Sequence, residues 1–134
     1  MLKLFIQLDL ESEEPIYIQL QHQIIEGIAK KKLKPGDPLP SVRSLAADIG
    51  INLHTVNKAY QHLKQEGFIL IHRQKGVVIN PDGFPKADET YRKQLKDSLQ
   101  PLISNSISRG LSKEDFLQIC SDIFNNFKEE GENE

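Results

Sequence analysis

Two short amphipathic segments joined by a glycine limit most strongly what this chain can fold into. Residues 41–50 and 53–66 each place apolar side chains at three- and four-residue spacing, so each predicts a helix with one buried face. The apolar residues are Val42, Leu45, Ala46 and Ile49 in the first segment and Val56, Ala59, Tyr60 and Leu63 in the second. Gly50 ends the first segment, where a left-handed residue reverses the chain at little cost. Because the two helices are so close in sequence, they predict a helix-turn-helix in which one packs across the other.

Three residues have side chains that favour packing of the two predicted helices across each other. Ser41 follows Pro40 and can cap the first helix through its hydroxyl oxygen. Ala46 is small where the two helices would touch, and Val56 would fill the angle between them. The pattern therefore agrees with the local chemistry at the start, the crossing and the turn.

The sequence on both sides completes a small domain. Residues 15–31 predict a helix that starts at a proline, and residues 34–40 hold three prolines and predict a rigid connector. Residues 68–71 and 77–79 favour strands, and the basic loop between them contains a glycine, which predicts a hairpin. The expected fold class is mainly α with a small β-hairpin wing: a winged helix-turn-helix over residues 1–80.

Charge is distributed unevenly along the chain. Residues 15–80 hold nine Lys and Arg against four Asp and Glu, whereas residues 81–134 hold seven against eleven. A basic segment beside an acidic tail indicates that only the basic segment meets a polyanion, although a small protein can show such a split by chance.

A winged helix-turn-helix presents the start of its third helix to the DNA major groove and its wing to the backbone or the minor groove. The candidate groove residues are Leu53, His54, Thr55, Asn57, Lys58 and Gln61, and the candidate wing residues are Arg73, Lys75 and Gly76. Asn and Gln can pair with adenine, and Lys can take guanine or a phosphate. Ser41 is either a helix cap alone or a cap that also faces a phosphate. The alternative for the third helix is a solvated polar face.

Residues 81–85 predict a linker, and residues 86–134 predict two helices that form a dimerisation tail. The first of these helices covers about residues 87–109, and Pro101 predicts a kink or break within it. The apolar stripe of the tail is too large for two isolated helices to bury, so we expect a twofold homodimer. Its candidate interface residues are Leu95, Leu99, Leu102, Phe116, Cys120, Ile123, Phe124 and Phe127. An effector pocket lined by tail aromatics is the alternative, and we expect Cys120 to be buried and inert.

Several classes of function find no support in the sequence. It has no phosphate-binding glycine loop and no nucleophile elbow, so we expect no enzyme and no cofactor. The four histidines lack metal-ligand spacing, so no metal is expected. The single cysteine, the absence of a long apolar stretch and the absence of a signal peptide favour a cytoplasmic protein away from the membrane.

Several short motifs resemble the DNA-binding half of the GntR family of bacterial transcription regulators. They are Pro15-Ile16-Tyr17, Lys34-Pro35-Gly36-Asp37, Leu39-Pro40-Ser41-Val42-Arg43, Leu45-Ala46, Gly50-Ile51-Asn52, Thr55-Val56, Ala59-Tyr60 and Glu66-Gly67. The short two-helix tail is similar to that of the YtrA-like subfamily, which lacks large effector domains.

The resemblance implies a dimer on a palindromic operator and autoregulated repression of an operon that often includes ABC transporter genes. It also implies that Arg43, the start of the third helix and Gly76 in the wing touch DNA. Many family members carry a basic residue where this chain has Leu53 and another where it has Asn57, so the operator sequence cannot be transferred. A winged-helix module that binds protein and no DNA remains the alternative, because the fold serves both purposes. The inducer, if there is one, stays open.

Overall fold

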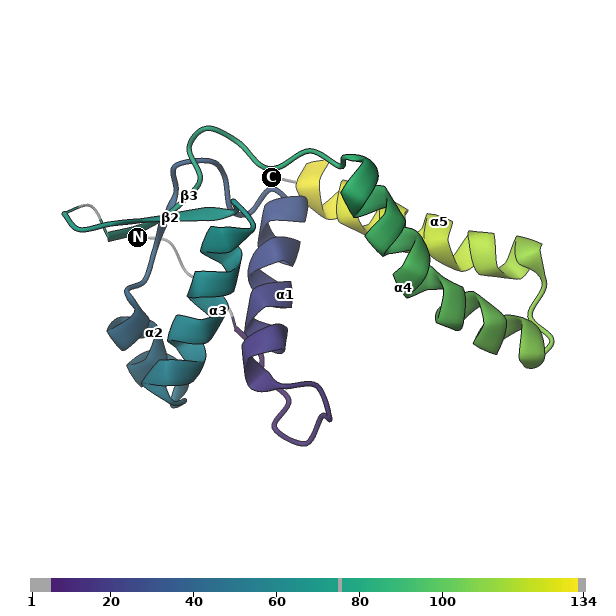
Figure 1. Ribbon diagram of the computed structural model, residues 1–134, viewed down its shortest axis with the longest axis horizontal. Helices are drawn as coiled ribbons and strands as arrows, with labels where there is room; N and C mark the ends of the chain where they lie inside the picture. The colour runs from purple at the N-terminus through teal and green to yellow at the C-terminus, as the bar shows by residue number, and fades with distance from the viewer. Residues whose placement is uncertain (1–5, 75, 133–134) are drawn as a thin grey trace. The chain divides into compact units, whose positions relative to one another are not determined.

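The computed structural model describes residues 6–74 and 76–132 as five helices and three short strands (Figure 1). In chain order they are α1 (Ile16–Ala29), β1 (Pro38–Leu39), α2 (Val42–Ile49), α3 (Leu53–Gln65), β2 (Ile69–His72), β3 (Gly76–Ile79), α4 (Glu89–Ser108) and α5 (Lys113–Glu132). The chain divides after Pro85 into two compact units, called here the N-terminal unit and the C-terminal unit. The winged helix-turn-helix fold expected from the sequence is confirmed.

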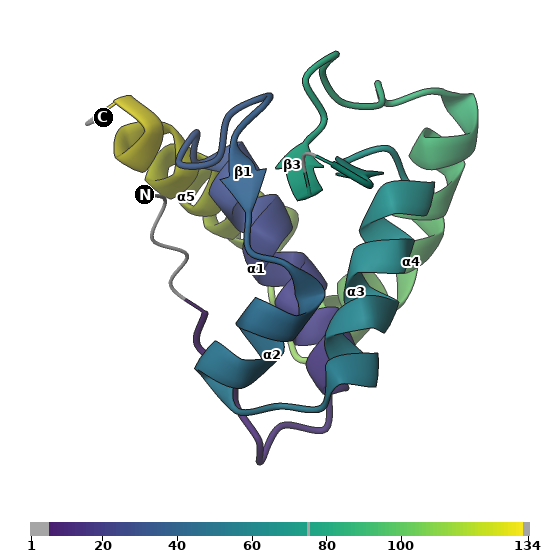
Figure 2. The same cartoon turned by 90° about the vertical axis from the view of Figure 1, so that its left-hand side faces the viewer.

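The core of the N-terminal unit lies between α1, α3 and the sheet. Its residues with no exposed surface are Leu20, Ile24, Val56, Ala59, Tyr60, Leu63, Ile69 and Ile79. The helical members recur at three- and four-residue spacing, so α1 and α3 each contribute one continuous apolar face. Figure 2 shows α2 beside α3 at one end of the unit and the strands at the other end.

The two ends of α2 have the chemistry that the sequence predicts, and α3 has a cap that was not predicted. The Ser41 side chain accepts a hydrogen bond from the Ser44 N–H at 3.1 Å, and Gly50 adopts the left-handed conformation with φ 68°. The Asn52 side chain caps α3 by accepting from the His54 N–H at 2.7 Å. Each of these side chains thus supplies an acceptor for one of the N–H groups that lack a partner in the first turn of its helix.

Tyr60 ties α3 to the segment that leads into α2. Its hydroxyl donates a hydrogen bond of 2.8 Å to the Pro40 carbonyl oxygen. The side chain has no exposed surface, and burial raises the pKa of the Tyr60 phenol well above its usual range. The hydroxyl therefore remains a hydrogen-bond donor throughout the physiological pH range.

The sheet has one strand more than the hairpin that the sequence predicts. β3 pairs antiparallel with β2 and also with β1, so the strand order is β1-β3-β2. β1 lies within the segment expected to be only a rigid connector, with Pro38 opposite Val78 and Leu39 opposite Val77. A proline is tolerated there because β1 is an edge strand.

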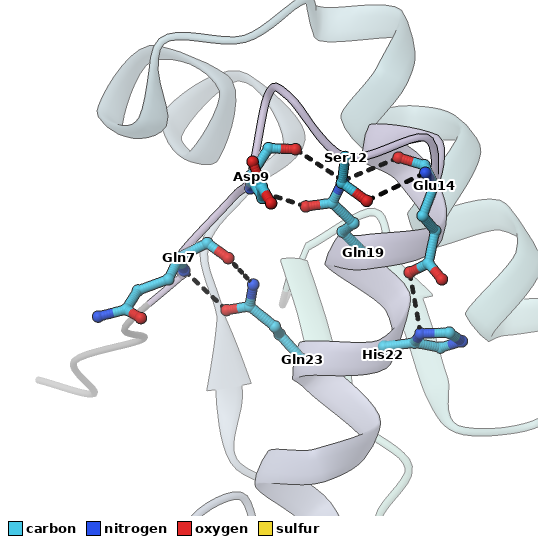
Figure 3. A network of polar contacts seen from close by, with 7 residues as sticks. All are labelled: Gln7, Asp9, Ser12, Glu14, Gln19, His22 and Gln23. Atoms are coloured by element: carbon cyan, nitrogen blue, oxygen red, sulfur yellow. Dashed lines mark hydrogen bonds and ion pairs between the residues drawn. The ribbon is translucent and has the colours of Figure 1, made fainter.

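A segment preceding α1 lies along that helix and was not anticipated (Figure 3). The Gln19 side chain accepts from the Asp9 N–H and donates to the Asp9 carbonyl oxygen, at 2.8 and 3.0 Å. The Gln23 side chain makes the same pair of hydrogen bonds with the Gln7 main chain. Nearby, the His22 Nδ1 lies 3.2 Å from a Glu14 carboxylate oxygen. Two glutamine amides thus hold an extended segment of main chain against α1.

The C-terminal unit consists of α4 and α5, which are joined by residues 109–112. The Ser112 hydroxyl oxygen accepts a hydrogen bond from the Asp115 N–H at 3.0 Å and so caps the start of α5. The break expected near Pro101 does not occur, because α4 runs as one helix of 20 residues through it. A proline removes only one hydrogen bond of the helical ladder, and the flanking turns hold the helix together here.

Candidate nucleic-acid interface

The polar face of α3 is the main surface that the sequence assigns to DNA. His54, Asn57 and Lys58 are exposed on it, and Thr55 and Gln61 are half-buried at its margins. Leu53, which the sequence also assigns to this surface, is half-buried, and part of its side chain packs against the core. An apolar side chain in the first turn gains more from covering the core than from facing water.

Arg43 and Ser41 lie at the start of α2. The Arg43 side chain is exposed and has no hydrogen bond or ion pair to another residue among those the structure describes. Ser41 uses its oxygen as the helix cap and keeps its hydroxyl proton for an outside acceptor. The first turns of α2 and α3 contain no acidic residue. Both helix starts therefore present positive partial charge without a neighbouring carboxylate on the same turn.

The hairpin of β2 and β3 projects from the N-terminal unit (Figure 1). His72 pairs with Gly76 at its end, and Arg73 is exposed in the turn between them. Gly76 has a backbone φ of 75°, which residues with a side chain rarely adopt. A Cβ atom added there would meet no atom within 4 Å. Lys75, which the sequence also assigns to the wing, lies outside the described residues. The turn thus offers one described cation and a glycine with open space above it.

Lys58 makes a contact that sequence reasoning missed. Its Nζ atom lies 4.0 Å from the centroid of the Tyr17 ring on α1. The same ring meets His62 edge-on, with 5.5 Å between the ring centroids and 81° between the planes. The motif Pro15-Ile16-Tyr17 was the available signal, but nothing in it indicates which residue of α3 the ring touches.

The residues assigned to dimerisation all lie in the C-terminal unit, and none of them is fully buried. Leu95, Leu102, Ile123 and Phe124 are exposed, whereas Leu99, Phe116, Cys120 and Phe127 are half-buried. Cys120 is thus more accessible than the sequence suggested. Two helices alone do not enclose these side chains, so each of them keeps part of its surface exposed.

An open groove of about 730 Å³ runs along α4. Its lining comes from Arg92, Leu95, Lys96, Leu99, Gln100, Ile103, Ser104 and Ile107. Ile103 was missed by sequence reasoning, which chose its neighbour Leu102 for the same stripe. The aliphatic side chains Leu95, Leu99, Ile103 and Ile107 follow one another along the groove, and the two cations Arg92 and Lys96 lie toward the N-terminal end of α4.

Within residues 6–74 and 76–132, no three His, Cys, Asp or Glu side chains come together to hold a metal ion. The helices in the same ranges include none that is both long and apolar enough to cross a membrane.

Comparisons with known proteins assign this architecture to a family. The family model described as "Bacterial regulatory proteins, gntR family" matches residues 16–79, which covers α1 to β3. The HTH-type transcriptional repressor YtrA of Bacillus subtilis (strain 168) is 39% identical over 109 residues, which cover 81% of this chain and 84% of that protein. The chain belongs to the GntR family. It is therefore a DNA-binding transcription regulator, and no enzyme family was found among the matches.

Solved structures support the same assignment for this GntR regulator. YtrA from Sulfolobus acidocaldarius, a GntR-family transcription factor, is 44% identical with a TM-score of 0.60, and the match covers 74% of this chain and 97% of that one. A protein from Listeria monocytogenes EGD-e described as a transcriptional antiterminator has a TM-score of 0.85 at 25% identity, covering 95% and 94%. The likeness to the Listeria protein covers 95% of this GntR regulator, so it includes the two-helix tail as well as the N-terminal unit.

Proposed function

We propose that this regulator binds a palindromic operator as a homodimer and represses the operon that encodes it, in the cytoplasm. The observation that carries the proposal is the set of exposed polar side chains at one end of α2 and α3, around Arg43, His54 and Asn57. Repression is supported by the similar repressor of Bacillus subtilis.

The start of α3 enters the major groove of one half-site. Asn57 and Gln61 have the amide groups that pair with adenine, and His54 can donate to a purine. Arg43 at the start of α2 and Arg73 in the wing contact phosphates on either side. Ser41, Thr55 and the main chain at Gly76 add shorter contacts to the backbone, and Lys75 belongs to the same wing. Leu53 supports the start of the helix from the core side and makes no polar contact with a base.

The C-terminal unit joins two copies of this chain. The exposed apolar groove of α4 accepts α5 of a second copy, whose first turn carries Glu114 and Asp115. Arg92 and Lys96 at the groove complement these carboxylates. The predicted interface residues from Leu95 to Phe127 then become buried between the copies. Twofold symmetry of the dimer implies twofold symmetry of the operator.

Binding to DNA with and without Arg43 tests the proposal. Selection from a random DNA pool should return a palindrome, and Arg43→Ala should weaken binding to it by about 1–3 kcal/mol. Lys32→Ala removes the same charge just beyond α1 and serves as the matched control, with little effect on binding. The logarithm of the association constant should fall steeply with the logarithm of salt concentration.

Three results would contradict the proposal. A pool that yields no enriched sequence, together with a flat salt response, would indicate a protein-binding module. Equal binding by the Arg43 and Lys32 variants would show that Arg43 does not contact DNA. A monomer in sedimentation at micromolar concentration, where 15.3 kDa is the mass of one chain, would remove the dimer.

A further inference from the structure

Tyr17 and Lys58 meet where the first turn of α1 lies against α3. The Lys58 ammonium stands over the ring at 4.0 Å from its centroid, which is well within the range of a cation–π interaction. The His62 ring, one turn further along α3, lies nearly perpendicular to the same ring. The Tyr17 ring therefore contacts two side chains of the helix that the proposed function places in the major groove.

The ring is better fixed than the lysine. Tyr17 is half-buried and packs against the core of the N-terminal unit. Lys58 is exposed, and among the described residues its ammonium makes no hydrogen bond or ion pair. A ring that covers one side of an ammonium group leaves its N–H donors free on the other side. Lys58 thus keeps donors for an acceptor outside the protein.

The contact also sets the direction of the lysine. Lys58 follows His54 by four residues, so the two lie on the same side of α3, one turn apart. The ring on α1 draws the ammonium toward that neighbouring helix and away from the middle of the polar face, where Asn57 is exposed. An ammonium at the margin of a helix in the major groove is placed for the sugar–phosphate backbone rather than for a base edge.

We propose that Tyr17 is a positioning residue that holds Lys58 for contact with a DNA phosphate beside the half-site. The inference rests on the proposed placement of α3 in the major groove. A lysine side chain loses rotamer freedom when it binds, and the ring removes part of that loss beforehand. The gain is limited by the strength of an exposed cation–π contact, which corresponds to about two- to fivefold in affinity.

Four variants of the full chain test this: Tyr17→Phe, Tyr17→Leu, Lys58→Met and the double variant Tyr17→Leu/Lys58→Met. Affinity is measured for the selected operator and for a random duplex at several salt concentrations. Lys58→Met should weaken binding to both duplexes by a similar factor and reduce the salt slope by about 0.9, the value for one phosphate.

The Tyr17 variants then separate positioning from folding. Tyr17→Leu should weaken binding about two- to fivefold, while Tyr17→Phe, which keeps the ring, should bind like the original chain. In the Lys58→Met background, Tyr17→Leu should have no further effect, because the ring has nothing left to position. Equal losses with and without Lys58 would show that the ring only supports the fold, and would overturn the proposal.

A second measurement does not depend on how well the leucine variant folds. In the unaltered chain the ring current of Tyr17 should shift the ε-methylene protons of Lys58 upfield in the NMR spectrum, and an unshifted signal would overturn the contact. A Lys58→Met loss confined to the operator, with the salt slope unchanged, would make Lys58 a base contact and also overturn the inference. If the unaltered chain binds no duplex at all, the proposed function fails with it. If the unaltered chain binds the operator and Tyr17→Leu has no effect on that binding, the positioning role of Tyr17 is wrong while the proposed function stands.

Discussion

The two units of this chain differ in how completely they bury their own apolar residues. In the N-terminal unit, α1, α3 and the sheet enclose a core in which Leu20, Tyr60 and Leu63 have no exposed surface. In the C-terminal unit, none of the residues from 86 to 128, whose side chains the structure describes, is buried. Two helices of 20 residues leave Leu102 59% exposed and Phe124 76% exposed.

From this difference we expect the N-terminal unit to fold by itself and the C-terminal unit to need a further apolar surface that covers it. Fully burying a leucine or phenylalanine side chain stabilises the folded state by about 1.5–3 kcal/mol. The C-terminal unit does not gain this stabilisation at several positions. The N-terminal unit holds the surface proposed to bind DNA, and the C-terminal unit holds the surface proposed to bind a second copy. If this division of roles holds, changes in the two units have separable effects on DNA binding, dimerisation and stability.

The largest effect is expected when the C-terminal unit is removed. A fragment ending at Pro85 keeps Phe84, whose ring lies 6.0 Å from that of Phe68 and packs against the core. The fragment should fold, yet bind the palindrome about 10²–10⁴-fold more weakly than the full chain, because the second half-site is no longer reached intramolecularly. Binding to a duplex with one half-site, measured at the same salt concentration, provides the control and should change little. Equal affinity for the palindrome would mean that the tail is not the device that joins two copies.

Truncating one leucine in each unit should give two kinds of effect. Leu63→Ala leaves a cavity in the closed core and should lower the free energy of unfolding of the N-terminal unit by about 2–5 kcal/mol, independent of protein concentration. Leu99→Ala removes a half-buried side chain from the groove of α4 and should act mainly on the dimer. Denaturant midpoints at two protein concentrations distinguish the cases, because only a dimer contact makes the midpoint concentration-dependent. A concentration-independent loss at Leu99 would contradict the division.

The smallest effect concerns alkaline pH and the closed core. Burial raises the pKa of Tyr60, so above about pH 10 the unfolded chain releases a proton that the folded chain keeps. The free energy of unfolding should therefore fall as pH rises, by up to about 1.4 kcal/mol per pH unit from this residue. In Tyr60→Phe the fall between pH 9 and pH 11 should be shallower, although the variant starts lower at pH 9 because its bond to Pro40 is gone. Parallel curves for the two proteins would show that Tyr60 does not cause the alkaline loss.

The elements that the sequence predicts well are those whose causes lie within a few residues. Ser41 caps α2 and Gly50 ends it, and both features follow from neighbours in the chain. The same holds for the polar face of α3, where His54 and Asn57 are exposed as expected. Local spacing and capping chemistry are sufficient there, because no distant segment competes for those groups.

The features that sequence reasoning missed depend on distant partners. β1 has only two residues, one of which is a proline, so it shows no alternation of its own and forms only by pairing with Val77 and Val78, about 40 positions later. The ring that Lys58 contacts belongs to another helix. Ile103 is different: it continues the four-residue spacing of Leu95 and Leu99 along α4, so local periodicity was sufficient to choose it over its neighbour Leu102.

The glutamine contacts of Figure 3 depend on a coincidence of lengths. Gln19 and Gln23 are separated by four residues of helix, a rise of about 6 Å, and Gln7 and Asp9 are separated by two residues of extended chain, about 6.6 Å. The two distances are nearly equal, so glutamine side chains one turn apart on a helix can reach alternate residues of an extended segment. A bare strand edge accepts almost any sequence and thereby invites aggregation. Here the partners are two glutamine side chains one helical turn apart, and they pair with the main chain of Gln7 and Asp9, so the contact is specific to this segment and this helix.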